Sequence, residues 1–144
     1  MQRQQHNIMN YFSSDFKLGI LGGGQLGKML LTETRKFDIQ TYILDSSPEA
    51  PAQFGAHAFY QGSLLDYDTV YRFGKLVDLL TIEIENINLD ALDQLEAEGL
   101  LIYPSPKTLR LIQNKGHQKD FYSANEIPTA PYQRFADVTS LNQA

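Results

Sequence analysis

The stretch KLGILGGGQLG, residues 17–27, decides the fold that this sequence predicts. Its first half is the apolar core of a buried strand, and its glycines at 22, 24 and 27 follow the spacing G-x-G-x-x-G. In that spacing the glycines allow a tight turn, a close approach of ligand to backbone, and close packing of the next helix. We expect this helix to open at Gln25 or Leu26. Since first-turn amides lack internal partners, the turn is a candidate nucleotide-binding site, with a purely structural turn as the alternative.

The composition indicates an acidic globular protein with one main domain. The chain has 144 residues, of which 42% are hydrophobic, a formal net charge of -5, and no cysteine. No cluster of lysine or arginine stands out, so we expect no binding to nucleic acid and no binding to a membrane. Without cysteine, disulfides, thiolate metal sites and cysteine nucleophiles are excluded. No apolar run reaches membrane-spanning length, and the expected location is cytoplasmic.

Strands and helices alternate after the glycine turn. Further strands are predicted at 40–45, 56–60, 78–83 and 100–103. The first helix should run to about Lys36, and later helices are predicted at 49–54, 66–74 and 89–98. This alternation is typical of a parallel sheet with right-handed crossovers. We therefore predict an α/β fold with a Rossmann-like doubly wound parallel sheet over residues 17–103, preceded by a mobile N-terminal extension at 1–16.

The pattern changes after Pro104. Helices are predicted at 106–114 and 116–125, a proline-bracketed linker at 127–131, a strand at 132–135, and the start of a helix at 137–144. A lone strand and a helix start have no sheet of their own to join. The segment 104–144 is therefore predicted to begin something larger.

Two carboxylates lie at the end of the fourth predicted strand, in the run TIEIEN. With strand order 3-2-1-4, the end of this strand lies beside the glycine turn, at the edge where doubly wound sheets bind ligands. Glu83 and Glu85 are two residues apart and would share a face. Such carboxylates can hold ribose hydroxyls, an amine or a metal ion, and equally can be solvated or cap the next helix. We take Glu83 as a candidate binding residue and leave Glu85 open.

Asp45 supports a competing hypothesis. It ends the second strand, where NAD-binding domains place the acidic residue that holds the adenine ribose. The alternative function is therefore a stand-alone Rossmann NAD-binding regulatory module.

Histidines and lysines add little chemistry. His6, His57 and His117 are far apart, without the spacing of metal ligands, and are predicted to be structural. Lys115 and Lys119 share a helical face at i, i+4 and could reach a phosphate.

Five motifs in a fixed order identify a family. They are LGGGQLGKM at 21–29, TIEIEN at 81–86, PSP at 104–106, QNK at 113–115 with Lys119 after it, and IPTAP at 127–131. In this combination residues 17–144 resemble the N-terminal region of 5-(carboxyamino)imidazole ribonucleotide synthases, which are ATP-grasp enzymes of purine biosynthesis. Related families are the ATP-grasp glycinamide ribonucleotide transformylases and, more distantly, biotin carboxylase.

The resemblance implies a ligase reaction and roles for particular residues. ATP would phosphorylate bicarbonate, and the carboxyphosphate would deliver carbon dioxide to the amine of aminoimidazole ribonucleotide. Residues 17–103 would be the pre-ATP-grasp domain, and residues 104–144 would be linker helices and the first part of an ATP-grasp domain. The implied ribonucleotide contacts are Gly23, Gly24, Gln25, Leu26 and Glu83, and the implied ATP contact is Lys115.

The same resemblance places much of the chemistry elsewhere. The family's metal-binding carboxylates and most of its ATP contacts lie beyond residue 144. We therefore expect no catalytic and no metal-binding residue within this chain, and ATP with Mg²⁺ bound only in the full-length enzyme. The 144 residues alone are expected to lack synthase activity, and a homodimer, the usual state of the family, is left open.

Overall fold

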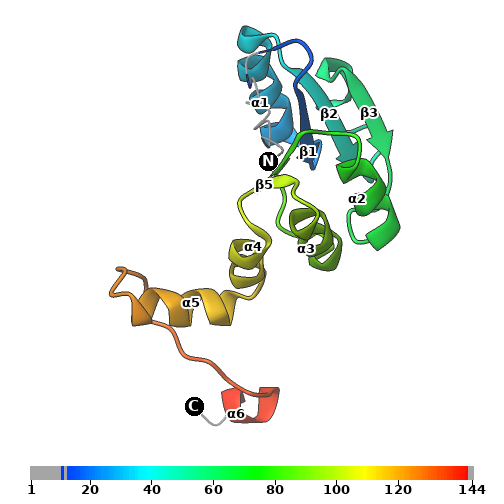
Figure 1. The fold of residues 1–144 in the computed structure, drawn as a ribbon. Helices are drawn as coiled ribbons and strands as arrows, with labels where there is room; N and C mark the ends of the chain where they lie inside the picture. The colour runs from blue at the N-terminus through cyan, green and yellow to red at the C-terminus, as the bar shows by residue number, and fades with distance from the viewer. Residues whose placement is uncertain (1–10, 12, 143–144) are drawn as a thin grey trace, which may run out of the picture. The chain divides into compact units, whose positions relative to one another are not determined.

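The computed structural model describes Tyr11 and residues 13–142, and it divides into two units (Figure 1). The first unit ends at Pro106 and the second begins at Lys107. The first unit contains a sheet of five parallel strands in the order β3-β2-β1-β4-β5. The strands are β1 (Lys17–Leu21), β2 (Gln40–Asp45), β3 (Ala58–Gln61), β4 (Leu79–Ile82) and β5 (Leu101–Tyr103). The predicted α/β class and the order 3-2-1-4 are confirmed.

β1 is the central strand because it pairs on both of its sides. Leu18 is in register with Thr41 of β2 and with Leu79 of β4. Ile20, in the same strand, is 0% exposed and packs with Leu31 in a cluster completed by Ile43 and Ala52. A strand buried on both faces explains why the sequence here is continuously apolar rather than alternating.

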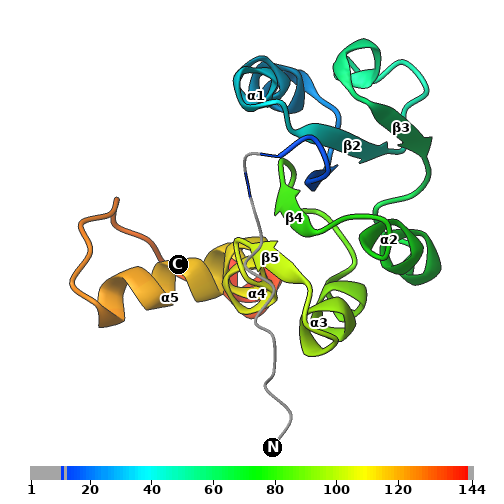
Figure 2. The same ribbon diagram turned by 45° about the horizontal axis from the view of Figure 1, so that its top comes forward.

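Helices cover both faces of the sheet. Figure 2 shows α1 (Gln25–Thr34) on one face, and α2 (Tyr67–Gly74) and α3 (Leu89–Ala97) on the other. A short 3-10 helix, η1 (Arg35–Phe37), continues α1. The helix predicted after the glycine turn is therefore confirmed, with its last residues wound more tightly than expected.

Side-chain caps define where α2 and α3 begin. Asp66 accepts a hydrogen bond from Thr69 N at 2.8 Å, and Asn88 accepts one from Ala91 N at 2.9 Å. Each cap satisfies a first-turn amide that has no partner within its helix. Gly99 follows α3 with a φ of 95°, a left-handed conformation that glycine adopts without strain.

α2 and α3 pack closely because of one glycine. A Cβ added to Gly74 would lie 2.3 Å from Leu95 Cδ1, so no larger residue fits there. Val70 and Phe73 of α2, which the sequence pattern turned inward, are 0% and 3% exposed, and Leu92 of α3 is 0% exposed.

The helix predicted at 49–54 is wrong. Residues 48–52 form turns, and only a 3-10 helix, η2 (Gln53–Gly55), follows. Pro51 has no N–H to donate within a helix. Ala52 N donates instead to Gly23 O at 2.9 Å, so this amide is bound to the glycine turn and does not continue a helix from the preceding residues.

The second unit contains helices, and the strand predicted at 132–135 is wrong. Its helices are α4 (Pro106–Gln113), which begins at the boundary, α5 (Lys115–Ala124) and α6 (Val138–Asn142). Residues 131–135 have no regular structure, and Tyr132 instead donates to Asp120 Oδ1 at 3.0 Å. A strand needs a neighbour to receive its backbone hydrogen bonds, and the described part of this unit contains no strand.

The predicted extension at 1–16 lies mostly outside the described residues. Phe16, its last residue, is only 6% exposed, and its carbonyl accepts a hydrogen bond from Gln40 N at 3.0 Å. Among the residues that the structure describes, no helix has the length and apolar character to cross a membrane.

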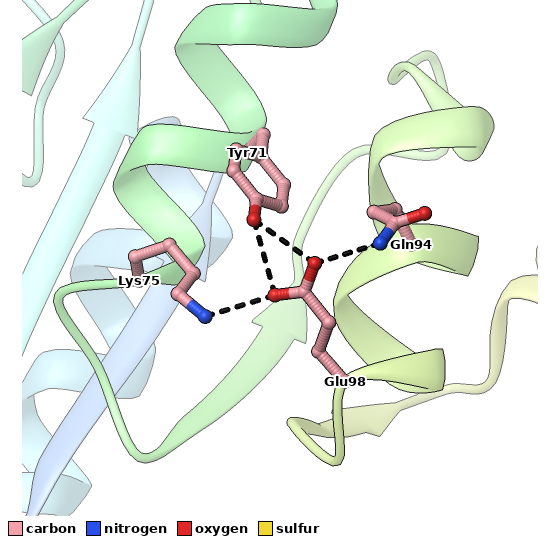
Figure 3. Close-up of polar contacts among 4 residues, drawn as sticks. All are labelled: Tyr71, Lys75, Gln94 and Glu98. Atoms are coloured by element: carbon pink, nitrogen blue, oxygen red, sulfur yellow. Dashed lines mark hydrogen bonds and ion pairs between the residues drawn. The ribbon is translucent and has the colours of Figure 1, made fainter.

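A hydrogen-bonded cluster of Tyr71, Lys75, Gln94 and Glu98, the Glu98 cluster, joins α2 to α3 (Figure 3). It lies near the C-terminal ends of both helices, at the amino ends of the strands. Glu98 accepts hydrogen bonds from Gln94 Nε2 at 2.7 Å, Lys75 Nζ at 2.8 Å and Tyr71 Oη at 2.9 Å. These hydrogen bonds, that of Gln94 foremost, lower the pKa of Glu98 to about 2. The hydrogen bond to Glu98 in turn raises the pKa of both Tyr71 and Lys75.

Replacement of Glu98 should change how stability depends on acid. Its pKa falls from 4.5 to about 2 on folding, so the ionised carboxylate stabilises the fold above about pH 4.5. This contribution is lost as the pH falls from about 4.5 toward 2. We expect Glu98→Gln to lower the Tm by a few degrees at neutral pH and to reduce the further loss of Tm in acid.

The measurement is thermal unfolding followed by circular dichroism at neutral pH and in steps down to strong acid. Glu96→Gln is the matched control, because it removes a carboxylate from the same helix without touching the cluster. If the Tm of the wild type and of Glu98→Gln fell equally in acid, the stabilising role of the ionised Glu98 would be contradicted.

Candidate functional site

Backbone hydrogen bonds fix the glycine turn at the carboxyl end of β1. Gly22 N donates to Leu44 O at 2.9 Å, and Gly22 has a φ of 103°, which favours glycine. Gly27, in the first turn of α1, packs against this backbone, since a Cβ there would lie 2.8 Å from Gly22 O. The turn and the helix start therefore form one compact unit at the edge of the sheet.

Glu83 lies directly beside this turn. Its backbone N donates to Leu21 O at 2.9 Å and so extends the pairing of β1 with β4. A Cβ added to Gly22 would lie 2.5 Å from Glu83 Oε2, and one added to Gly24 would lie 2.8 Å from Oε1. The structure thus brings together Gly24 and Glu83, two of the residues that the sequence singled out. A side chain at Gly24 would displace the carboxylate from this position.

The N-terminus of α1 completes the edge with hydrogen-bond donors. Gly24 precedes the helix, no side chain caps it, and the first turn contains no acidic residue. The first-turn amides can therefore bind an external acceptor. Gln25 is exposed and Leu26 is 63% exposed, so both side chains are open to a ligand. The site offers backbone donors on one side and a carboxylate acceptor on the other.

Asp45, on which the NAD alternative depends, binds the protein's own backbone. Its Oδ2 accepts a hydrogen bond from Gly23 N at 2.6 Å, and its Oδ1 accepts one from Ser47 N at 2.8 Å. Both oxygens are therefore engaged within the chain. Sequence reasoning missed this role, although an aspartate two residues before a donating amide, here that of Ser47, is the pattern of an Asx-turn.

The two lysines of α5 have different neighbours. Lys115 is the exposed first residue of the helix, and its Nζ lies 3.3 Å from Gln118 Oε1. Lys119 donates to Thr129 Oγ1 and lies 5.8 Å from the centre of the Tyr132 ring. Lys119 is therefore held by its own unit, whereas Lys115 has one long contact that a ligand can replace.

The described histidines show no sign of metal binding. His57 Nδ1 accepts a hydrogen bond from Thr41 N at 3.0 Å, so its imidazole supports the start of β3. His117 lies exposed on α5. Among the described residues, no group of three or more histidine, aspartate or glutamate side chains is arranged to hold a metal ion.

Comparisons with known proteins agree with the sequence motifs. A phosphoribosylaminoimidazole carboxylase of Candida albicans is 37% identical over 113 residues, which are 76% of this chain and 20% of the relative. The solved N5-carboxyaminoimidazole ribonucleotide synthetase of Thermotoga maritima is 37% identical, with a TM-score of 0.80, over 89% of this chain and 36% of its own. The N5-carboxyaminoimidazole synthase of Aspergillus clavatus, solved with ADP and 5-aminoimidazole ribonucleotide, is 35% identical, with a TM-score of 0.71.

These proteins are much longer than this chain. The match to the Aspergillus synthase covers 85% of this chain and 32% of that one, so the chain spans about a third of the solved structures and a fifth of the Candida relative. The shared part is their N-terminal region, as the resemblance implied. The model of the ribonucleotide synthetase preATP-grasp domain matches residues 16–113, and the chain therefore belongs to this family.

Proposed function

We propose that the chain forms the ribonucleotide-binding part of an N5-carboxyaminoimidazole ribonucleotide synthase, an ATP-dependent carbon–nitrogen ligase of de novo purine biosynthesis. The synthase would use ATP and bicarbonate to carboxylate the amine of 5-aminoimidazole ribonucleotide. One observation carries the proposal. The carboxylate of Glu83 lies against Gly22 and Gly24, at the edge of the sheet where ligands bind.

The chemistry of the site suits this ribonucleotide. Its ribose hydroxyls and exocyclic amine are donors, and the Glu83 carboxylate can accept hydrogen bonds from them. The backbone amides of Gln25 and Leu26 are donors that can bind its hydroxyl oxygens. The side-chain amide of Gln25 can both donate and accept a hydrogen bond. We assign Gly24, Gln25, Leu26 and Glu83 to this ribonucleotide site. Gly23, whose N–H and carbonyl bind Asp45 and Ala52, would form part of the turn that positions them. A similar synthase, that of Aspergillus clavatus, has been solved with 5-aminoimidazole ribonucleotide.

We further propose that ATP and Mg²⁺ bind mainly to an ATP-grasp domain, of which residues 104–144 would be the beginning. Lys115 would contribute one contact to ATP, through its exposed ammonium group at the start of α5. As a single charge on a flexible stem, lysine can neutralise a phosphate but cannot form the paired hydrogen bonds of arginine.

Aminoimidazole ribonucleotide should bind the purified chain and shift the amide resonances of residues 23–26. In Glu83→Gln, which keeps the size of the side chain and removes its charge, we expect the Kd to rise about tenfold. Titration followed by ¹H–¹⁵N correlation spectra measures both effects.

The matched control for this titration is Glu49→Gln, because Glu49 is an exposed carboxylate in the loop after β2. It should leave the Kd unchanged. The proposal fails if the wild type shows no ligand-induced shifts, or if Glu83→Gln binds as tightly as the wild type.

The 144 residues alone should bind without turnover, since the proposed ATP-grasp chemistry needs residues that this sequence does not contain. We expect no bicarbonate-dependent ADP release from purified chain supplied with ATP, Mg²⁺ and aminoimidazole ribonucleotide. Robust turnover would show that the proposed dependence on the ATP-grasp domain is wrong.

NADH should not bind in the micromolar range. The carboxylate that would have to hold the adenine ribose is already bound to Gly23 and Ser47. A fluorescence titration of the chain with NADH tests this. Saturable binding that disappears in Asp45→Ala would favour the alternative NAD-binding module over the synthase.

A further inference from the structure

We propose that Asp45 is a positioning residue for the ribonucleotide site, which holds the glycine turn in its binding conformation and excludes phosphate from it. The inference rests on the proposed function for the identity of the ligand. The role of Asp45 in holding the turn does not depend on the ligand, so this role and the proposed function can be tested separately.

The peptide groups around Gly23 are held from both sides. Gly23 N donates to Asp45 Oδ2 at 2.6 Å, and Gly23 O accepts from Ala52 N at 2.9 Å. A charged acceptor makes the first of these bonds the stronger kind. The second oxygen of Asp45 accepts from Ser47 N at 2.8 Å, which fixes the orientation of the carboxylate itself.

This arrangement gives the turn two different sides. A Cβ on Gly23 would lie 3.0 Å from Ala50 Cβ and 3.1 Å from Ile43 Cγ2, so Gly23 faces the protein. A Cβ on Gly24 would instead lie 2.8 Å from Glu83 Oε1, so Gly24 faces the proposed ligand site. By binding Gly23, Asp45 determines which part of the turn is presented to the ligand.

The same contact changes what the turn can bind. In glycine turns that bind phosphate, backbone amides point at the anion. Here the amide of Gly23 already has an anionic partner, the carboxylate of Asp45. Glu83 places a second carboxylate on the opposite side of the turn. Repulsion from two carboxylates favours hydroxyl and amine groups of a ribonucleotide at this point over its phosphate.

Three variants separate this role from general stability. Asp45→Ala removes both acceptor oxygens, and Asp45→Asn retains one oxygen for one of the two amides. Glu49→Gln removes a nearby exposed carboxylate and serves as control. For each variant we would record the Gly23 amide resonance, its hydrogen exchange rate, the Tm, and the Kd for aminoimidazole ribonucleotide well below the Tm.

We expect Asp45→Ala to shift the Gly23 resonance, accelerate its exchange, and raise the Kd about tenfold or more, as misplaced binding groups do. Asp45→Asn should give intermediate values, and Glu49→Gln should match the wild type. Inorganic phosphate should shift residues 22–26 in Asp45→Ala, less in Asp45→Asn, and not in the wild type.

Three results would overturn the inference. They are an unchanged Gly23 resonance in Asp45→Ala, an unchanged Kd despite a lowered Tm, and phosphate-induced shifts of the turn in the wild type. If the wild type binds no aminoimidazole ribonucleotide, the proposed function fails. The Gly23 resonance and the phosphate titration then still decide the role of Asp45.

Discussion

The close approach of α1 to the end of β1 is the constraint on which the first unit depends. A Cβ at Gly27 would lie 2.8 Å from Gly22 O, so any other residue would push the helix away from the sheet. The same helix places Leu31, 2% exposed, against the buried side chains of β1 and β2. One backbone contact therefore sets both the packing of the core and the position of the helix N-terminus at the binding edge.

Much of the first unit could be predicted because its signals are local or topological. The run QTYILD gave both ends of β2, at Gln40 and Asp45, from its branched and aromatic residues. The strand order was expected because it is the usual one in doubly wound parallel sheets. Since that order puts the end of β4 beside the glycine turn, the proximity of Glu83 to Gly24 could be predicted without any structural information.

The features that escaped prediction depend on partners distant in sequence. Asp45 was interpreted by its spacing from the glycines, but its hydrogen bond to Gly23, 22 residues away, gives it another role. The segment 49–54 contains residues that fit a helix, yet the bond from Ala52 to Gly23 and the proline at 51 prevent one. Glu98 was read only as the end of a helix, because its partners on α2 come together with it only in the folded chain.

The glycine turn lies at the carboxyl ends of the strands, and the Glu98 cluster lies near their amino ends. Strands of four or five residues separate these ends by about 13 to 17 Å. Substitutions this far apart usually have independent, additive effects on free energy. The heat resistance of the protein can therefore be changed by substitutions between α2 and α3, while the selectivity of the glycine turn stays the same. In this small domain, thermal stability and ligand selectivity can therefore be changed independently of each other.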